Sequence, residues 1–165
     1  MNVEIGLPGQ SREAIGRILN ALLADEQVLY AKTRNYHWNV VGPQFRTLHL
    51  MFEEQYKMLA EQGDEIAERA RALGVTALGR MSAFLDHARL HEDGDAPPDA
   101  HTMVVNLAHD HEAMIQQLRK DVEVCDEQHN DQGTTDFLTG LMEAHEKQAW
   151  MLRAQAEESR QRSMP

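Results

Sequence analysis

The chain has 165 residues, of which 42% are apolar and 26% are charged. This composition is that of an ordinary globular protein, and the length predicts one domain over residues 1–165 with short flexible tails at about 1–10 and 159–165. The net charge of −11, from 27 acidic residues against 16 Lys and Arg, disfavours nucleic-acid binding and favours cations. No apolar run could span a membrane, no secretion signal is evident and Cys125 is alone, so we expect a cytoplasmic protein.

Two long helices are predicted in the first half of the chain from their apolar spacing. The first is expected to run from Ser11, as its N-cap, to Val40. The second is expected to run from Pro43 to Leu73, with Gly74 as its C-terminal stop.

A link from Val75 to Ala100 separates this pair from two further predicted helices, at about 101–126 and 134–160. The link is long for a connection between neighbouring helices, so we expect it to cross the length of the bundle, with a short helix from Ser82 to Leu90. The order of elements therefore predicts an all-α fold, the ferritin-like four-helix bundle with a short helix in the long crossover between helices 2 and 3.

Four residues have the chemistry of a metal site but a spacing that one subunit could hardly use. His49, Asp64 and Glu68 share one face of the second predicted helix, yet His49 and Asp64 lie about 22 Å apart at ~1.5 Å per residue. Two copies of this helix running antiparallel about a two-fold axis would bring His49 of one chain to the acids of the other, with His37 joining from the first helix. Imidazole and carboxylate together suit Fe, Zn and Mn.

The four residues also fit interpretations that involve no metal ion. Each of the four also fits a solvated acidic face with a histidine at a helix end, and Asp64 and Glu68 could simply pair with surface cations such as Arg69. The Glu-x-x-His motif of intrachain di-metal sites in four-helix bundles is absent, because no histidine has a glutamate three residues before it.

The sequence around these residues resembles a known family. HWNVVGPQFRTLHLMFEEQYKMLAEQGDEIAERARALG, at 37–74, closely resembles the signature of the Dps family of mini-ferritins, and DQGTTDFLTGLMEAHEKQAWMLRA, at 131–154, resembles the last helix of that family. The likeness covers about residues 11–158. The separations between His37, His49, Asp64 and Glu68 match the family pattern without a gap.

The resemblance implies a hollow homo-dodecamer with two-iron ferroxidase sites at its two-fold interfaces. His37 and His49 would come from one subunit, and Asp64 and Glu68 from the other. The family oxidises Fe(II), usually with hydrogen peroxide in preference to oxygen, and stores ferric iron in the cavity, which protects the cell from oxidative damage. Zn or Mn can substitute for iron at such a site.

The same resemblance assigns further roles near the site. Glu53 and Glu54 correspond to acids that seed the iron mineral on the inner wall, while Leu50 stands where several members carry another acid. Trp38 and Trp150 match tryptophans near the ferroxidase site, although both also fit a role as core aromatics.

The resemblance also implies a pore through which iron enters at the three-fold axes. Asp131 and Asp136 occupy the matching positions, and Asp126 and Glu127 add negative charge nearby. For Asp136, a place in the first turn of the last helix offers an alternative explanation, since the helix dipole favours acids there.

DNA binding, for which the family is named, is expected to be weak or absent. Members that condense DNA carry basic tails, but here the first ten residues hold no Lys or Arg, and the C-terminus offers only Arg160 and Arg162. Two alternative functions compete with the ferroxidase. One is a nucleoid-associated DNA-compacting protein, and the other is a helical binding module with an acidic face.

The remaining histidines leave a second metal site open. His87 and His91 are predicted on one face of the short crossover helix, and His109 and His111 on the third helix, all mainly as exposed polar residues. His145 lies on the apolar side of the last helix and is expected to be a core histidine with satisfied hydrogen bonds.

Overall fold

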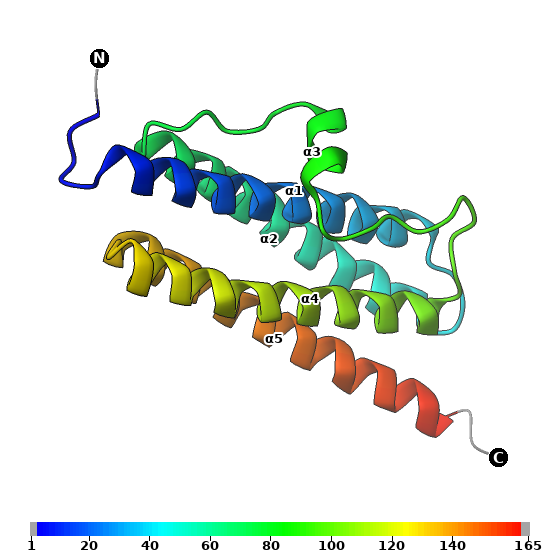
Figure 1. Cartoon of the computed structure of the whole chain (residues 1–165). Coiled ribbons are helices and arrows are strands. Elements are labelled where there is room, and N and C mark those ends of the chain that lie inside the picture. Colours follow the sequence, from blue (N-terminus) through cyan, green and yellow to red (C-terminus); the bar gives the residue numbers. More distant parts are fainter. Residues whose placement is uncertain (1–2, 163–165) are drawn as a thin grey trace.

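The computed structural model describes the backbone of residues 3–162 and the side chains of residues 3–157, and all regular elements in that part of the chain are helical. The four long helices are α1 (Gly9–Asn39), α2 (Phe45–Ala72), α4 (Ala100–Glu123) and α5 (Gln132–Arg162). α1 packs along α2 and α4 along α5, and the two pairs form the bundle (Figure 1). The short α3 (Met81–His87) packs on α1 within the crossover from α2 to α4. The predicted four-helix bundle with a short crossover helix is confirmed.

The first helix begins at Gly9, two residues before its predicted N-cap. The residue that precedes the helix is Pro8, which has no capping side chain and whose carbonyl oxygen accepts the N–H of Arg12 at 3.0 Å. Proline is suited to this place because it has no N–H of its own to satisfy. Ser11 therefore lies inside the helix, and its hydroxyl lies 3.3 Å from Nδ1 of His129 instead.

Two glycines define the ends of α2. Gly42, with φ of +111°, forms the turn after α1, and the helix begins at Phe45 rather than at the predicted Pro43. Gly74, with φ of +82°, ends the helix as predicted. A Cβ at Gly74 would lie 2.6 Å from the side chain of Val3, so the close contact with the N-terminal segment also requires glycine.

The crossover helix α3 is shorter than predicted because a side chain of α1 forms hydrogen bonds with the backbone that follows α3. The carboxylate of Asp25 accepts the backbone N–H groups of Arg89, at 2.5 Å, and Leu90, at 3.0 Å. The guanidinium of Arg89 pairs with the same carboxylate at 2.6 Å. His91 consequently lies outside the helix and does not share a helical face with His87, contrary to the prediction.

The third long helix does not stay α-helical to its predicted end. α4 ends at Glu123 and widens into a π-helical turn, η1 (Val124–Gln128). Its start is fixed by Asp99, whose side chain accepts the N–H of Thr102 at 3.1 Å and the hydroxyl of Thr102 at 2.6 Å. The bond from the hydroxyl, followed by the bond from the N–H, lowers the pKa of Asp99.

The last helix is longer than predicted at both ends. It begins at Gln132, where the side chain of Asp131 accepts the N–H of Thr134 at 3.2 Å. It continues to Arg162, so residues 159–162 of the predicted tail are helical. The rest of that tail, 163–165, lies outside the described residues.

The core is apolar along most of the bundle but includes a polar centre. Leu19, Phe52, Leu107 and Leu152 are typical fully buried residues of the four long helices. Burying a titratable side chain without a partner is costly. Glu26, His111 and His145 are nevertheless fully buried, and they form hydrogen bonds with one another.

Candidate functional site

Two predicted ligands form a close pair where α1 and α2 meet. His37 lies in the last turn of α1 and is buried, whereas His49 lies near the start of α2 and is partly exposed. Their rings stack with centroids 3.8 Å apart and planes at 20°. The structure thus brings together two histidines that are twelve residues apart in the chain.

Each histidine ring is held by the backbone of the other residue. Nδ1 of His37 lies 2.8 Å from the carbonyl oxygen of His49, and Nδ1 of His49 lies 2.8 Å from the carbonyl oxygen of His37. Because a carbonyl oxygen can only accept, both Nδ1 atoms carry the proton. In the neutral rings, Nε2 then has its lone pair available for a metal ion, and the Nδ1–H bond orients the ligand.

A cluster around the pair was missed by the reasoning from sequence. The ring of Tyr56 lies edge-on against His37, with centroids 5.2 Å apart and planes at 70°. The guanidinium of Arg34 lies 4.9 Å from the ring centroid of Trp38. A signal was present for Tyr56, since it follows His49 by seven residues and therefore lies about two turns along the same face.

The predicted acidic ligands lie elsewhere on the same subunit. Asp64 and Glu68 are exposed on α2, about four and five turns from His49. Over residues 3–157, no group of three or more His, Cys, Asp or Glu side chains is arranged to hold a metal ion within one chain. The division of the four ligands between two subunits stays a prediction.

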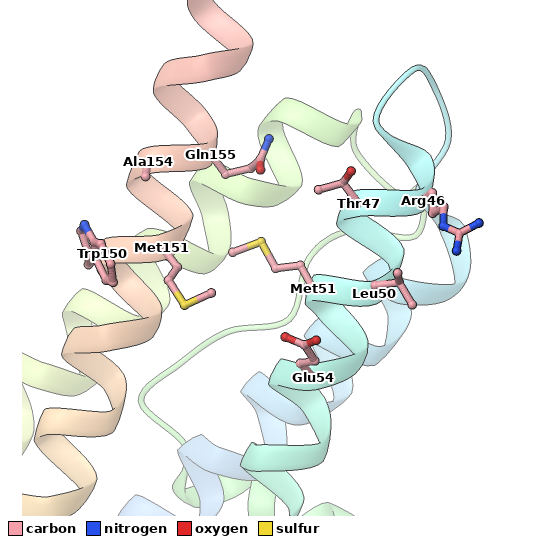
Figure 2. Close-up of a pocket in the computed structure, with 9 residues that line it drawn as sticks. All are labelled: Arg46, Thr47, Leu50, Met51, Glu54, Trp150, Met151, Ala154 and Gln155. Atoms are coloured by element: carbon pink, nitrogen blue, oxygen red, sulfur yellow. The ribbon is translucent and has the colours of Figure 1, made fainter.

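A groove of about 640 Å³ lies between α2 and α5 (Figure 2). Its lining includes Leu50, Glu54 and Trp150. Trp38 and Trp150 are each 63% exposed in the subunit, so the alternative that they are core aromatics is wrong.

The two predicted nucleation acids differ in their surroundings. Glu54 is exposed and lines the groove. Glu53 pairs with Lys57, one turn further along α2, at 2.5 Å. The hydrogen bond from Lys57 and its charge lower the pKa of Glu53.

The two predicted pore acids differ in a similar way. Both carboxylate oxygens of Asp131 lie 3.2 Å from Nη2 of Arg69, and the side chain also caps α5 through Thr134. Burial alone would raise the pKa of Asp131, but the bonds from Thr134 and the charge of Arg69 lower it overall. Asp136 is exposed and lies beyond the first turn of α5, so the alternative explanation by the helix dipole does not apply.

The other histidines that were considered as possible ligands differ in burial. His87, His91 and His109 are exposed, as expected. His145 is fully buried and hydrogen bonded, which confirms its prediction as a core histidine, and His111 is fully buried beside it rather than exposed.

Within the described residues, no helix is both long and apolar enough to cross a membrane.

Comparison with known proteins supports the same family as the local geometry. The ferritin-like domain family matches residues 17–161. The chain is 50% identical over 152 residues to a low temperature-induced protein of Nostoc sp., covering 92% of this chain and 85% of that protein. It is 41% identical over 137 residues to DNA protection during starvation protein 2 of Bacillus anthracis, covering 83% and 92% of the two chains.

A solved structure gives the same result for the fold. The DPS protein from Vibrio cholerae O1, described as a member of a broad superfamily of ferritin-like diiron-carboxylate proteins, superposes with a TM-score of 0.87 at 34% identity. The superposition covers 93% of this chain and 96% of that one. The chain therefore belongs to the Dps family of ferritin-like proteins.

Proposed function

We propose that the protein is a mini-ferritin that oxidises Fe(II), preferably with hydrogen peroxide, and stores the ferric product inside a hollow dodecamer. The ferroxidase site would combine His37 and His49 of one subunit with Asp64 and Glu68 of a second. The observation that carries the proposal is the reciprocal bonding of the two rings to backbone carbonyls, which leaves both Nε2 atoms as ligands.

The donor set suits iron as a substrate. The carboxylates of Asp64 and Glu68 would bind Fe(II) most strongly, with His37 completing one iron position and His49 serving the other, directly or through water. Two Fe(II) ions give one electron each to hydrogen peroxide, whose O–O bond breaks to leave two hydroxide ions. Both reagents of hydroxyl-radical chemistry are thus consumed together. Zn²⁺ or Mn²⁺ would compete for the same donors.

Within each proposed pair of acids, one carboxylate is already in an ion pair among the described residues and the other is not. Glu54 lines the groove and would seed mineral directly, whereas the ion pair between Glu53 and Lys57 would have to break first. At the pore, Asp136 is free to attract entering Fe(II), whereas Asp131 is already paired with Arg69. We expect the protein to act in the cytoplasm.

The test is to load the metal-free protein with Fe(II) under anaerobic conditions and then to add peroxide or oxygen. We expect the near-ultraviolet absorbance of ferric oxide to grow faster with peroxide, and the Asp64→Ala variant to lose this reaction. A mass of about twelve times the 18.8 kDa chain would support the shell. Oxidation no faster than in buffer would refute the proposed activity.

A separate measurement addresses DNA. The net charge of −11 per chain disfavours contact with phosphate groups, so we expect no retention of DNA in a mobility-shift titration at ~150 mM salt. Tight retention there would favour the nucleoid-associated alternative.

A further inference from the structure

Three polar side chains in the bundle core link the two pairs of helices. Glu26 from α1, His111 from α4 and His145 from α5 are each 0% exposed. Nε2 of His145 lies 2.8 Å from Oε1 of Glu26, and its Nδ1 lies 2.8 Å from Nδ1 of His111. The α1–α2 pair is thus hydrogen bonded to the α4–α5 pair at a point that solvent does not reach.

The contact between the two rings limits how many protons they hold. The ionised Glu26 can only accept, so Nε2 of His145 carries a proton. Nitrogens 2.8 Å apart are joined by one hydrogen, so one Nδ1 donates and the other keeps its lone pair. The two rings therefore hold at most three protons on their four nitrogens, which corresponds to one positive charge. A fourth proton would set two N–H groups against each other.

Glu26 is the only other charged group in contact with the two rings in the described part of the chain. The buried residues of α2 include no titratable side chain, and those of the described part of α5 include only His145. The remaining buried titratable groups of α1 and α4 have partners of their own, which are Arg89 for Asp25 and Asp121, Asp110 for Lys32, Asp93 for Tyr36 and the carbonyl of His49 for His37.

Burial restricts proton uptake in the same direction. Nε2 of His111 makes no hydrogen bond within the described structure, so a proton placed there has no acceptor. Desolvation by burial, followed by the charge of His145, holds the pKa of His111 well below its ordinary value. In the unfolded chain, both histidines become charged below about pH 6.5. In mild acid the folded protein therefore takes up fewer protons than the unfolded chain.

We propose that His111 and His145 form an acid-sensitive switch, which keeps the bundle closed at neutral pH and favours its opening below about pH 6. A second positive charge enters the pair only when the two rings move apart, since their contact leaves room for one hydrogen. That movement separates α4 from α5 and exposes Glu26 and both rings to water. The proposal rests on the core alone and not on the proposed ferroxidase site.

Acid should lower the stability of the bundle, because the unfolded chain binds the additional proton and the folded protein does not. The stabilisation is complete above the ordinary histidine pKa of about 6.5 and is lost as the pH falls below it. One proton corresponds to a rise of about 10-fold in the unfolding equilibrium constant for each pH unit. Burial raises the pKa of Asp110 and of Asp121, which acts in the opposite direction, so matched variants are needed to isolate the histidines.

The test compares urea unfolding of the metal-free, full-length wild type and His111→Gln at one protein concentration, from about pH 7.5 to 5. In the variant, the amide oxygen of the new side chain accepts Nδ1–H of His145, so this ring is free to carry a charge. Below about pH 6, we expect the unfolding constant of the wild type to rise about 10-fold more per pH unit than that of the variant. The other titrating groups are the same in both proteins and cancel in this comparison.

The matched control is His109→Gln, which makes the same change at an exposed histidine of the same helix and should follow the wild type. An equal pH dependence of the wild type and His111→Gln would mean that the core pair is only a hydrogen-bond network, and would overturn the proposal.

A measurement on the wild type keeps the proposal testable if His111→Gln does not fold. Deuterium exchange at Cε1 of each histidine, followed by tandem mass spectrometry, reports the protonation of each ring in the folded oligomer. We expect no titration step for His111 above about pH 5, with the exposed histidines as internal references. A step for His111 between about pH 6 and 7 would overturn the proposal.

Discussion

The two histidine pairs of this molecule are bonded in different ways. His37 and His49 each donate Nδ1–H to a backbone carbonyl, which leaves their Nε2 atoms free, and the acids proposed to complete their site lie four to five turns away on the same chain. His111 and His145 face each other in the core, and their acid, Glu26, belongs to the same chain. The two pairs thus differ in where their acid lies: within hydrogen-bond distance for the core pair, and, under the proposed function, on a second subunit for His37 and His49.

Removing the acid of the core pair should have the largest effect. Glu26→Ala leaves Nε2–H of His145 unpaired and opens a cavity, so we expect metal-free protein to lose about 3 kcal/mol of unfolding free energy. The control is Glu146→Ala, which removes the exposed partner of Arg119 from the next position on α5 and should cost less than about 1 kcal/mol. Urea unfolding at one protein concentration measures both, and equal midpoints would contradict the core assignment.

Removing one histidine of the proposed ferroxidase site, His37, should strongly slow iron oxidation without this loss of stability. We expect His37→Ala to lower the initial rate with peroxide at least about 100-fold, since even outer-shell changes at metal sites cost 10- to 100-fold. His101→Ala, at an exposed histidine in the first turn of α4, is the control and should keep the wild-type rate. A His37→Ala enzyme with wild-type rates would remove His37 from the site.

Disturbing the predicted two-fold interface should reduce both the mass of the particle and the rate of iron oxidation. Trp38 is exposed beside His37, and Trp38→Glu would place two like charges across that interface. We expect a smaller particle by light scattering and about 10-fold slower oxidation. Trp38→Phe should keep both assembly and rate. Slow oxidation in a particle of unchanged mass would argue that Trp38 acts in some way other than assembly.

Freeing Glu53 should give the smallest effect. Lys57→Met removes the hydrogen bond that lowers the pKa of Glu53, so this carboxylate becomes available to iron but loses its charge at a higher pH than in the wild type. At neutral pH we expect mineral growth to quicken about two-fold, with the initial oxidation rate unchanged. Lys120→Met, at an exposed lysine of α4, is the control. No change in mineral growth would indicate that Glu54 alone seeds the mineral.

Apolar spacing and glycine placement made the bundle predictable. The long helices and the stop at Gly74 depend on local sequence, and the structure confirms them. The end of α3 could not be predicted, because it depends on Asp25 reaching backbone groups 64 and 65 residues along the chain.

The two histidine clusters also differ in how far the sequence could predict them. His37 and His49 were predictable from their residue type, from their spacing to Asp64 and Glu68 and from the motif at 37–74, but their mutual hydrogen bonds were not. The core cluster escaped a motif search because its members are 34 and 119 residues apart in pairs, from three different helices. Only packing brings them together.

The most direct test of the shared site is complementation between two inactive variants. His37→Ala and Asp64→Ala chains are assayed separately and then after refolding together as mixed oligomers. If the ligands come from two subunits, half of the randomly formed dimers are hybrids with one restored site of two, so we expect about one quarter of the wild-type activity. A mixture that remains as inactive as its two components would contradict a site shared between subunits.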